Sequence, residues 1–303
     1  MDYLSLYVTF LKRFLKVKRH LKVVFDSSNG TTGLVLKPLF RNHPFIEPVF
    51  INAEPNGNFP AHGPNPLDPK ALADVGQAVK KHKADAGVVF DADGDRAFFV
   101  DNLGRPLAAD EAALLVGKNL KGPVVLTPLS GFLLRDQLKK AGRKIVDSRV
   151  GNYFIKKIMQ KKRIAFGAEI SGHYYFKDFF FVDSAIFATI QFLNSLSGLK
   201  KPLSAWLGSL PMYYRIPETN FVIQNKAAMM KKIEARYKKE ARRITHLDGV
   251  SMEFGPSTGS GQVQQWWFNV RPSQTEDLLR LSLEAKDEKV LEKKLKELTQ
   301  LIQ

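Results

Sequence analysis

The segment 88–96, which reads Val-Val-Phe-Asp-Ala-Asp-Gly-Asp-Arg, carries the residues best suited to chemistry in this sequence. Three apolar residues run directly into carboxylates at Asp91, Asp93 and Asp95, and Arg96 closes the segment. Apolar residues that lead into polar ones after a helical stretch predict a buried strand whose carboxyl end delivers side chains to a ligand site. The three aspartates would supply hard oxygen ligands, which suit Mg²⁺ better than a soft metal.

Three other interpretations of this segment are weaker. Asp and Gly are ordinary turn residues, but three crowded carboxylates without a cation would repel one another. Residues 90–93 also resemble the D-x-D opening of haloacid-dehalogenase-type phosphatases, yet that motif lies on the first strand of its fold and here it lies near residue 90. An EF-hand loop needs glycine at its sixth position, and here Gly94 is fourth.

A second group of polar side chains follows a predicted strand at residues 164–169. Glu169, Ser171 and His173 present a carboxylate, a hydroxyl and an imidazole at alternate positions. This alternation predicts that the three side chains lie on one side of an extended segment, where they would suit the recognition of adjacent sugar hydroxyls. A turn at the end of a strand, with one buried glutamate, is the alternative interpretation.

A third group lies near the carboxyl terminus, in Arg271-Pro272-Ser273-Gln274-Thr275. One arginine, two hydroxyls and the amides of a turn within five residues would make a good phosphate cradle. A hairpin turn with an exposed arginine explains the same residues equally well.

The spacing of apolar residues predicts the elements that position these groups. Short apolar runs alternate with helical segments, which predicts two consecutive α/β domains with mixed or parallel sheets. Their predicted strands are residues 21–26, 46–51, 88–90, 124–127, 144–146 and 164–169, and their predicted helices are residues 34–40, 67–83, 132–141, 153–160 and 185–193. We expect Asp183 to cap the last of these helices, and Phe179, Phe180 and Phe181 to lie in the core.

A C-terminal α+β domain is predicted after Pro- and Gly-containing segments at residues 199–202 and 208–211. Its predicted strands are residues 213–216, 266–270 and 278–284, and its predicted helices are residues 226–243 and 288–302. The first of these helices carries eight bases and two acids. We interpret most of these bases as a solvated face.

Composition limits the possible function classes. The 303 residues carry a formal net charge of +16, but no nucleic-acid reading motif accompanies it, so a general attraction for anions such as phosphorylated substrates is the better inference. The chain has no cysteine, which fits a reducing compartment, and we expect the cytoplasm. No long apolar run predicts a membrane span. Residues 1–20 predict an amphipathic helix, with a helix on a membrane surface as the weaker option.

Taken together, the motifs resemble those of the α-D-phosphohexomutase superfamily, in particular its phosphomannomutase/phosphoglucomutase branch. The matching segments occur in the family's order and are residues 24–30, 57–66, 91–96 (D-x-D-x-D-R), 169–173 (E-x-S-G-H) and 271–275 (R-x-S-x-T). The resemblance begins near residue 20. It implies an N-terminal helix at 1–20, a metal-binding domain at 21–117, a sugar-binding domain at 118–208 and a phosphate-binding domain at 209–303.

The resemblance also implies a role for each motif residue in phosphoryl transfer between C1 and C6 of hexose phosphates. Asp91, Asp93 and Asp95 would hold Mg²⁺, and Arg96 would face the transferring phosphoryl group. Glu169 and Ser171 would bind sugar hydroxyls, with His173 as a proton-transfer group. The non-transferring phosphate would be gripped by Arg271, Ser273 and Thr275.

One part of the family pattern has no counterpart in this sequence. Family members carry a first domain with a T-x-S-H-N-P-type loop, whose serine is phosphorylated in the active enzyme, and no such loop occurs here. The resemblance therefore implies a truncated, incomplete mutase whose first domain a separate chain could supply. The alternative is a relative that binds Mg²⁺ and phosphosugars without turnover.

Overall fold

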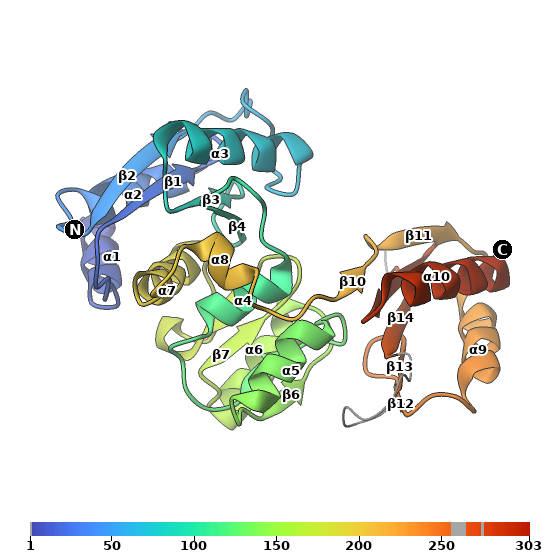
Figure 1. The fold of residues 1–303 in the computed structure, drawn as a ribbon. Coiled ribbons are helices and arrows are strands. Elements are labelled where there is room, and N and C mark those ends of the chain that lie inside the picture. Colours follow the sequence, from blue (N-terminus) through green and yellow to red (C-terminus); the bar gives the residue numbers. More distant parts are fainter. Residues whose placement is uncertain (1, 256–264, 274–275) are drawn as a thin grey trace.

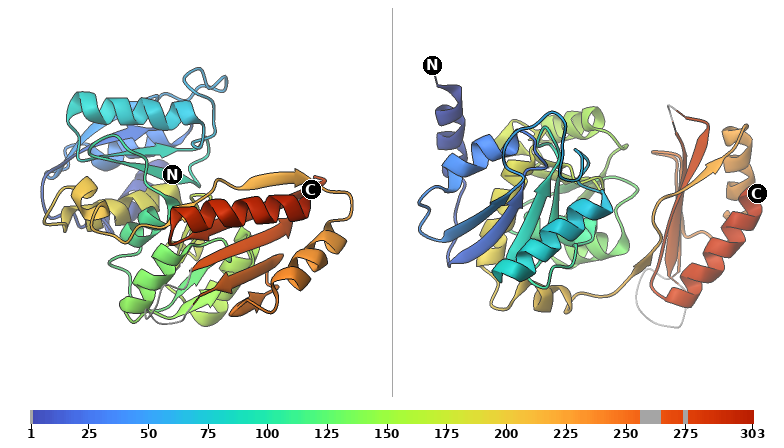
Figure 2. Two further views of the ribbon diagram at one scale, coloured as in Figure 1. Left: turned by 45° about the vertical axis from the view of Figure 1, so that its right-hand side comes forward. Right: turned by 90° about the horizontal axis from the view of Figure 1, so that it is seen from above.

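The computed structural model describes residues 2–255, 265–273 and 276–303. Over this part of the chain three β-sheets follow one another (Figure 1). We name the parts that build them the first unit (residues 3–101), the middle unit (109–207) and the C-terminal unit (214–302). The first two units lie against each other, and the C-terminal unit stands to one side (Figures 1 and 2).

The first unit has a four-stranded sheet. Its elements are α1 (Tyr3–Lys12), β1 (Leu21–Asp26), α2 (Thr32–Phe40), β2 (Ile46–Ile51), α3 (Pro69–His82), β3 (Ala86–Phe90) and β4 (Ala97–Asp101). The order is β2-β1-β3-β4, with the first three strands parallel and β4 antiparallel to β3. Helix α3 covers one face, where its Val75 and Val79 pack against Val24 and Val89. The carboxyl ends of β1 and β3 therefore emerge on one edge.

The middle unit has a five-stranded sheet in the order β6-β5-β7-β8-β9. Its elements are α4 (Ala109–Val116), β5 (Val124–Leu126), α5 (Phe132–Lys140), β6 (Ile145–Asp147), α6 (Asn152–Lys162), β7 (Phe166–Ala168), β8 (Tyr174–Phe176), a 3₁₀ turn (Lys177–Phe179), β9 (Val182–Asp183), α7 (Ala185–Ser197) and α8 (Leu203–Leu207). Strands β6, β5 and β7 are parallel, and β8 and β9 extend the sheet antiparallel. The predicted pair of α/β domains is confirmed.

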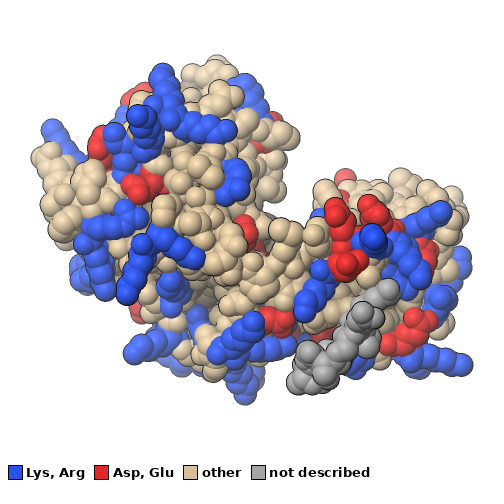
Figure 3. Space-filling model, viewed as in Figure 1, with Lys and Arg blue, Asp and Glu red and all other residues tan. Residues whose placement is uncertain are grey.

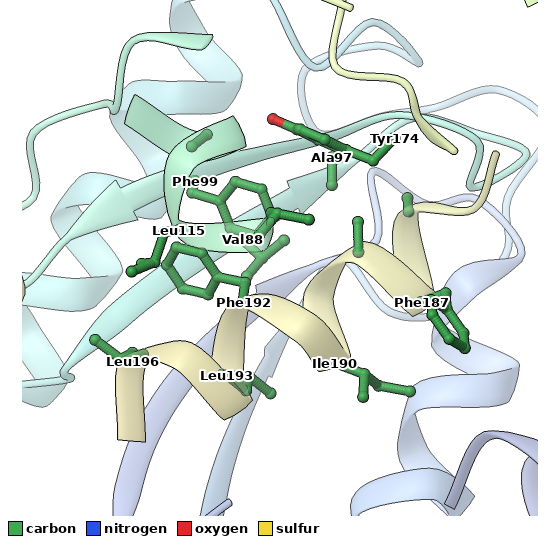
Figure 4. Packing of buried hydrophobic residues seen from close by; sticks show 14 of the residues in the cluster. Val88, Ala97, Phe99, Leu115, Tyr174, Phe187, Ile190, Phe192, Leu193 and Leu196 are labelled. Carbon is green, nitrogen blue, oxygen red and sulfur yellow. The ribbon is translucent and has the colours of Figure 1, made fainter. Parts of the chain in front are cut away.

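Helix α7 joins the first and middle units through one apolar core. All of its residues are buried, which is typical of a helix that has packing partners on every side. Phe192 of α7 stacks on Phe99 of β4 with 4.1 Å between ring centroids, and Val88 of β3 lies in the same cluster (Figure 4). The core of the first sheet is thus completed by a helix of the middle unit.

Two expectations at the ends of helices α7 and α1 are wrong. Ser184, not Asp183, caps α7, because its hydroxyl accepts a hydrogen bond from the Phe187 amide at 3.2 Å. Helix α1 ends at Lys12, well before residue 20. The chain after it instead runs along α7, where the Lys16 amide donates to Asn194 Oδ1 at 2.6 Å and the Lys18 amide to Ser197 Oγ at 3.1 Å.

Phe179, Phe180 and Phe181 were all expected in the core, and the structure confirms this for Phe179 and Phe181 but not for Phe180. Phe179 packs against the shared core of the first two units, and Phe181 against the separate cluster beneath α6. Phe180 is 70% exposed and stacks on Phe10 of α1. The tight turn after the 3₁₀ segment, with positive φ at both Phe180 and Phe181, directs consecutive side chains to different sides.

The C-terminal unit has an antiparallel sheet with two helices on one face. Its elements are β10 (Tyr214–Arg215), β11 (Thr219–Val222), α9 (Lys226–Tyr237), β12 (Arg243–Thr245), β13 (Val250–Phe254), β14 (Trp266–Pro272), β15 (Leu278–Ala285) and α10 (Glu288–Ile302). The order is β10-β15-β14-β13-β12, and β11 also pairs with β15. The helices lie on the side away from the other units (Figure 2), so the uncovered face points toward them.

The predicted helix at residues 226–243 ends earlier than expected. Helix α9 stops at Tyr237, and Arg243 begins strand β12. The Arg242 amide donates to the Glu253 carbonyl at 2.8 Å, and Arg243 pairs with Glu253 across the sheet. A run of basic side chains tolerates both conformations, and pairing with β13 decides between them.

The basic charge is not concentrated over one element. Figure 3 shows Lys and Arg side chains spread over all three units on the face it draws, interrupted by Asp and Glu. This distribution fits the interpretation of most bases as solvated. Within the part of the chain that the structure describes, no helix combines the length and apolar character needed to cross a membrane.

Candidate functional site

The loop after β3 is organised around the buried Asp91. Its Oδ1 accepts hydrogen bonds from the amides of Gly94, Asp95 and Arg96 at 3.0, 3.1 and 3.1 Å. Its Oδ2 accepts one from Arg96 Nε at 2.7 Å. Gly94 has φ of +77°, and a Cβ there would lie 2.5 Å from the Thr32 side chain, so this position needs glycine. Asp91 thus folds the loop while it faces the site.

The three aspartates form a cluster that can hold a metal ion. One oxygen from each of Asp91, Asp93 and Asp95 lies within 4.8 Å of the others. Burial opposes ionisation of Asp91, but hydrogen bonds to Asp95 and Arg96 outweigh burial and hold its pKa below the usual range. Burial and the neighbouring Asp91 carboxylate raise the pKa of Asp95 to about 7. This excess of negative charge is what a divalent cation would neutralise.

The loop after β1 packs directly against the backbone of the aspartate loop. The Thr31 amide donates to the Ala92 carbonyl at 2.9 Å. A Cβ on Gly30 would lie 2.2 Å from the same carbonyl oxygen, so the two backbones touch. His62, from the Pro- and Gly-rich loop, bonds to Asp26 Oδ2 at 3.1 Å and ties that loop to the end of β1.

Glu169, Ser171 and His173 do not lie along an extended segment, so that expectation is wrong. Residues 169–173 form the tight turn between β7 and β8, in which the Glu169 amide donates to the His173 carbonyl at 3.0 Å and the Gly172 amide to the Glu169 carbonyl at 3.2 Å. The turn forms because Gly172 adopts φ of +89°. The alternative interpretation, a strand-end turn with a buried glutamate, describes the backbone correctly.

Glu169 is held by two donors. Its Oε1 accepts a hydrogen bond from the Gly151 amide at 2.9 Å, and its Oε2 accepts one from the Tyr175 hydroxyl at 2.7 Å. Burial, followed by the charge of Glu169, raises the pKa of Tyr175 well above its usual range, so the phenol stays a donor. Ser171 is half-buried in the same turn.

The structure brings the aspartate cluster and the β7–β8 turn together. Arg96 and His173 form an antiparallel backbone bridge, and the Ala97 amide donates to the Gly172 carbonyl at 3.1 Å. His173 Nδ1 lies 3.8 Å from Asp95 Oδ2. Two loops more than seventy residues apart in sequence therefore form one polar surface at the boundary of the first two units.

Asp183 is a member of this site that the sequence analysis missed. His173 Nδ1 and Asp183 Oδ2 are 2.9 Å apart. Burial alone would lower the pKa of His173, but the bond to Asp183 and the charge of Asp95 outweigh it and raise that pKa. The pairing of Tyr175 with Asp183 in the β8–β9 register places this carboxylate, and no spacing in the sequence indicates that register.

The third predicted group lies on the uncovered face of the C-terminal sheet. Arg271, in β14, forms an ion pair with Glu218 at 2.9 Å. The Ser273 amide donates to the Leu278 carbonyl at 2.8 Å, whereas Thr275 lies outside the described residues. Among the described residues, no hydrogen bond or ion pair joins Arg271 or Ser273 to the other two loops. The structure brings together two of the three predicted groups.

Arg280 is a second residue that the sequence analysis missed. It lies directly opposite Arg271 in the β14–β15 pairing, so both side chains leave the same face. Both guanidinium groups contact Glu218, and the Nε of each is buried without a hydrogen-bond partner among the described residues. Arg280 Nη2 also donates to Glu276 Oε2 at 3.0 Å, so two carboxylates face the two guanidinium groups.

The fold and the site define a multidomain α/β protein. A cluster of carboxylates that could hold a metal ion lies beside an imidazole at the boundary of two sheets. A third sheet carries a pair of arginines. Three family models match the chain in sequence order: phosphoglucomutase/phosphomannomutase domain II at residues 5–104, domain III at 107–214 and the C-terminal domain at 218–301. The chain belongs to the phosphoglucomutase/phosphomannomutase family, within the α-D-phosphohexomutase superfamily.

Individual relatives agree with this assignment. The chain is 35% identical over 286 residues to a phosphomannomutase of Methanocaldococcus jannaschii, covering 93% of this chain and 61% of the relative. It is 33% identical over 321 residues to a phosphomannomutase of Vibrio cholerae, covering 99% and 65%. A phosphoglucomutase/phosphomannomutase family protein from Burkholderia thailandensis superimposes with a TM-score of 0.86 at 25% identity, covering 99% and 64%. The chain thus spans less than two thirds of the length of these relatives.

The family assignment confirms the resemblance expected from the motifs. It gives no support to the alternative of a haloacid-dehalogenase-type phosphatase, because all three family models belong to one other family. The order of the three models along the chain also agrees with the order of the predicted motifs.

Proposed function

We propose that this chain forms the metal, sugar and phosphate subsites of a phosphohexomutase, an enzyme that moves a phosphoryl group between C1 and C6 of a hexose phosphate. The observation that carries the proposal is the backbone bridge between Arg96 and His173. It joins a carboxylate cluster to an imidazole, which is a combination of charge neutralisation and proton transfer suited to phosphoryl chemistry. The name of the relatives supports the same reaction class.

Asp91, Asp93 and Asp95 are the residues that would hold Mg²⁺. Their donor set fits this ion, because it consists of closely spaced carboxylate oxygens with a partly exposed Asp95. When bound, Mg²⁺ would neutralise the charge that develops during phosphoryl transfer. Arg96, held by its bond to Asp91, would face the transferring group and orient its oxygens.

The β7–β8 turn would bind the sugar. Glu169 keeps lone pairs beyond its two donors, and Ser171 adds a hydroxyl, so both can meet sugar hydroxyls. His173 would give or take a proton at Nε2, because Asp183 engages its Nδ1. A bonded Nδ1 fixes the ring orientation, which is what a proton-transfer group requires.

The C-terminal sheet would grip the phosphate that is not transferred. Arg271, Ser273 and Thr275 would do so as the resemblance implies, and we add Arg280 because it lies opposite Arg271 with the same partner. Two guanidinium groups that share Glu218 could turn their remaining donors to one phosphate. Glu218 and, at Arg280, the exposed Glu276 would then orient the two arginine side chains.

The carrier of the phosphoryl group is the part that this sequence does not supply. We therefore propose that turnover needs a serine-loop domain in addition to these three units. A relative that binds hexose phosphates and Mg²⁺ without turnover is the second candidate, since its subsites would be the same. A cysteine-free chain fits a reducing compartment, and we propose the cytoplasm.

Calorimetric titration of the chain with glucose 1-phosphate and mannose 1-phosphate, with and without Mg²⁺, tests this proposal. We expect binding of at least one of them, and an affinity for Mg²⁺ that Asp95→Asn lowers by about 100-fold or more, since even indirect ligand partners are worth about 10- to 100-fold. Asp85→Asn is the matched control, because Asp85 is an ion-pair partner of Arg19 outside the aspartate cluster.

Two outcomes separate the candidates. Binding of neither sugar phosphate in the presence of Mg²⁺ would refute both. If binding occurs, the chain is mixed with a separately produced serine-loop domain of a relative. A gain of mutase activity supports the enzyme, and binding without any gain supports the non-catalytic relative.

A further inference from the structure

Two buried carboxylates meet where the C-terminal unit touches the middle unit. Asp110, in the first turn of α4, accepts a hydrogen bond from the Gly131 amide at 2.8 Å. Glu284, in β15 of the C-terminal unit, accepts one from the Phe132 amide at 2.7 Å. The two residues are 7% and 3% exposed. Two acids from different units thus occupy the N-terminus of the same helix, α5.

The second oxygen of Glu284 lies close to Asp110. A Cβ placed on Gly131 would be 2.2 Å from Glu284 Oε2 and 2.4 Å from Asp110 Oδ2. Both oxygens therefore occupy the small volume that a side chain at Gly131 would need. Two ionised carboxylates in such a volume repel each other, and the repulsion is relieved when they hold one proton between them.

The two arginines near this pair are also engaged in other contacts, so they neutralise the carboxylates only in part. Arg215 Nη1 lies 4.0 Å from Glu284 Oε2, while its Nη2 donates to the Leu129 carbonyl at 2.9 Å. Arg135 donates to the carbonyls of Ser130 and Thr127 and pairs with Asp147. The remaining titratable groups around the pair are neutral or acidic, namely Glu111, Asp136, Tyr174 and Tyr213.

The pKa shifts of the two acids indicate that their negative charge is only partly balanced by neighbouring groups. Burial and then the charge of Asp110 raise the pKa of Glu284 to about 7, although Arg215 opposes this. Burial raises the pKa of Asp110 as well. The N-terminus of α5 is equivalent to about half an elementary positive charge, so it offsets only part of two negative charges.

The uncovered face of the C-terminal sheet carries this contact and the arginine pair together. Arg280 and Glu284 are on the same side of β15, four residues apart, which corresponds to about 13 Å along a strand. The sheet is continuous between them. The position of Glu284 against α5 therefore sets the position of Arg271 and Arg280 relative to the first two units.

We propose that Asp110 and Glu284 form a carboxylate latch, which shares one proton and docks the C-terminal unit onto α5 in a pH-dependent way. An undocked Glu284 would be exposed and ionised, so the docked state binds the additional proton. Docking is then strongest at low pH, and it weakens as the pH rises toward the raised pKa of the docked glutamate. This inference concerns docking and stands independently of the proposed reaction.

Native-state hydrogen exchange of the Gly131 and Phe132 amides tests the latch in the full chain without substrate. These amides exchange only when the carboxylates leave them, so their protection, corrected for the intrinsic exchange rate, measures docking. Protection in the wild type should fall by up to tenfold per pH unit between about pH 5 and 7, and then level off, as linkage to one proton requires. Glu284→Gln keeps the acceptor for Phe132 and should show less than a twofold change.

Glu292→Gln is the matched control, because it makes the same change at an exposed position of α10. It should retain the pH dependence of the wild type. The latch is refuted if the wild type shows no dependence, or if Glu284→Gln keeps it. Should Glu284→Gln fail to fold, infrared spectroscopy of Asp95→Asn with and without Asp110→Asn replaces it, because Asp95 itself has a pKa of about 7. A carbonyl band of a protonated carboxylic acid must then disappear near pH 7 in Asp95→Asn and be lost when Asp110→Asn is added, and its persistence in either case overturns the proposal.

Discussion

The two boundaries between the three units are built in different ways. The first and middle units share one apolar core, in which Phe99 and Phe192 stack and α7 is buried throughout. The C-terminal unit has a separate core around residues such as Phe268. It meets the middle unit through polar contacts such as those of Glu284 and Arg215.

This difference separates the candidate site into a fixed part and an adjustable part. Apolar packing involves no titratable group, so the shared core holds the aspartate cluster and the β7–β8 turn in one geometry at any moderate pH. Polar contacts depend on protonation and on water competition. Under the latch that we propose, deprotonation of Glu284 would change the distance of the arginine pair from the aspartate cluster. The fixed part would perform the chemistry, and the adjustable part would select and release the phosphate.

The largest effect is expected from Phe192→Ala. Truncation of a fully buried phenylalanine costs about 3–5 kcal/mol, and here it should destabilise the first and middle units together. Urea denaturation should show one transition for these two units shifted to lower urea and a second transition unchanged. Phe268→Ala is the control, because it should shift only the second. A shift of both transitions by either variant would contradict the division into two cores.

A medium effect is expected from Asp183→Asn within the fixed part. Loss of the charge that faces Nδ1 should lower the pKa of His173, because the bond to Asp183 helps to raise it. Titration of the His173 ring by nuclear magnetic resonance measures this. Asp178→Asn, on the exposed 3₁₀ turn, should leave the pKa unchanged. An unaltered pKa in Asp183→Asn would mean that Asp183 does not position the ring.

The smallest effect is expected from Arg280→Ala in the adjustable part. Removal of one of two arginines should weaken the binding of a hexose phosphate by about five- to tenfold, or about 1 kcal/mol, because a charge-assisted contact to phosphate is lost. Calorimetry measures this, with Arg236→Ala on the exposed face of α9 as the control. Equal affinities of the wild type and Arg280→Ala would remove Arg280 from the phosphate subsite.

The sequence predicted what local patterns encode. The strand that leads into Asp91 and the alternation of strands and helices are properties of short segments, and both were predicted correctly. Asp183 and Arg280 enter the site through strand register, which depends on partners distant in sequence. The end of α9 was missed for a related reason, because β13 competes for a basic segment. The turn at Glu169 was only the alternative interpretation, because alternation alone does not reveal positive φ at Gly172.

The position of α7 in the sequence also matters while the chain is being made. The last strand of the first sheet ends at Asp101, but helix α7, which completes the cover of the face opposite α3, is complete only at Ser197. At about 5–20 residues per second, the first sheet would emerge from the ribosome about 5–20 seconds before its cover. During this interval the face that carries Phe99 is open to water and to other apolar surfaces, so nascent chains of this protein should depend on protection until α7 arrives.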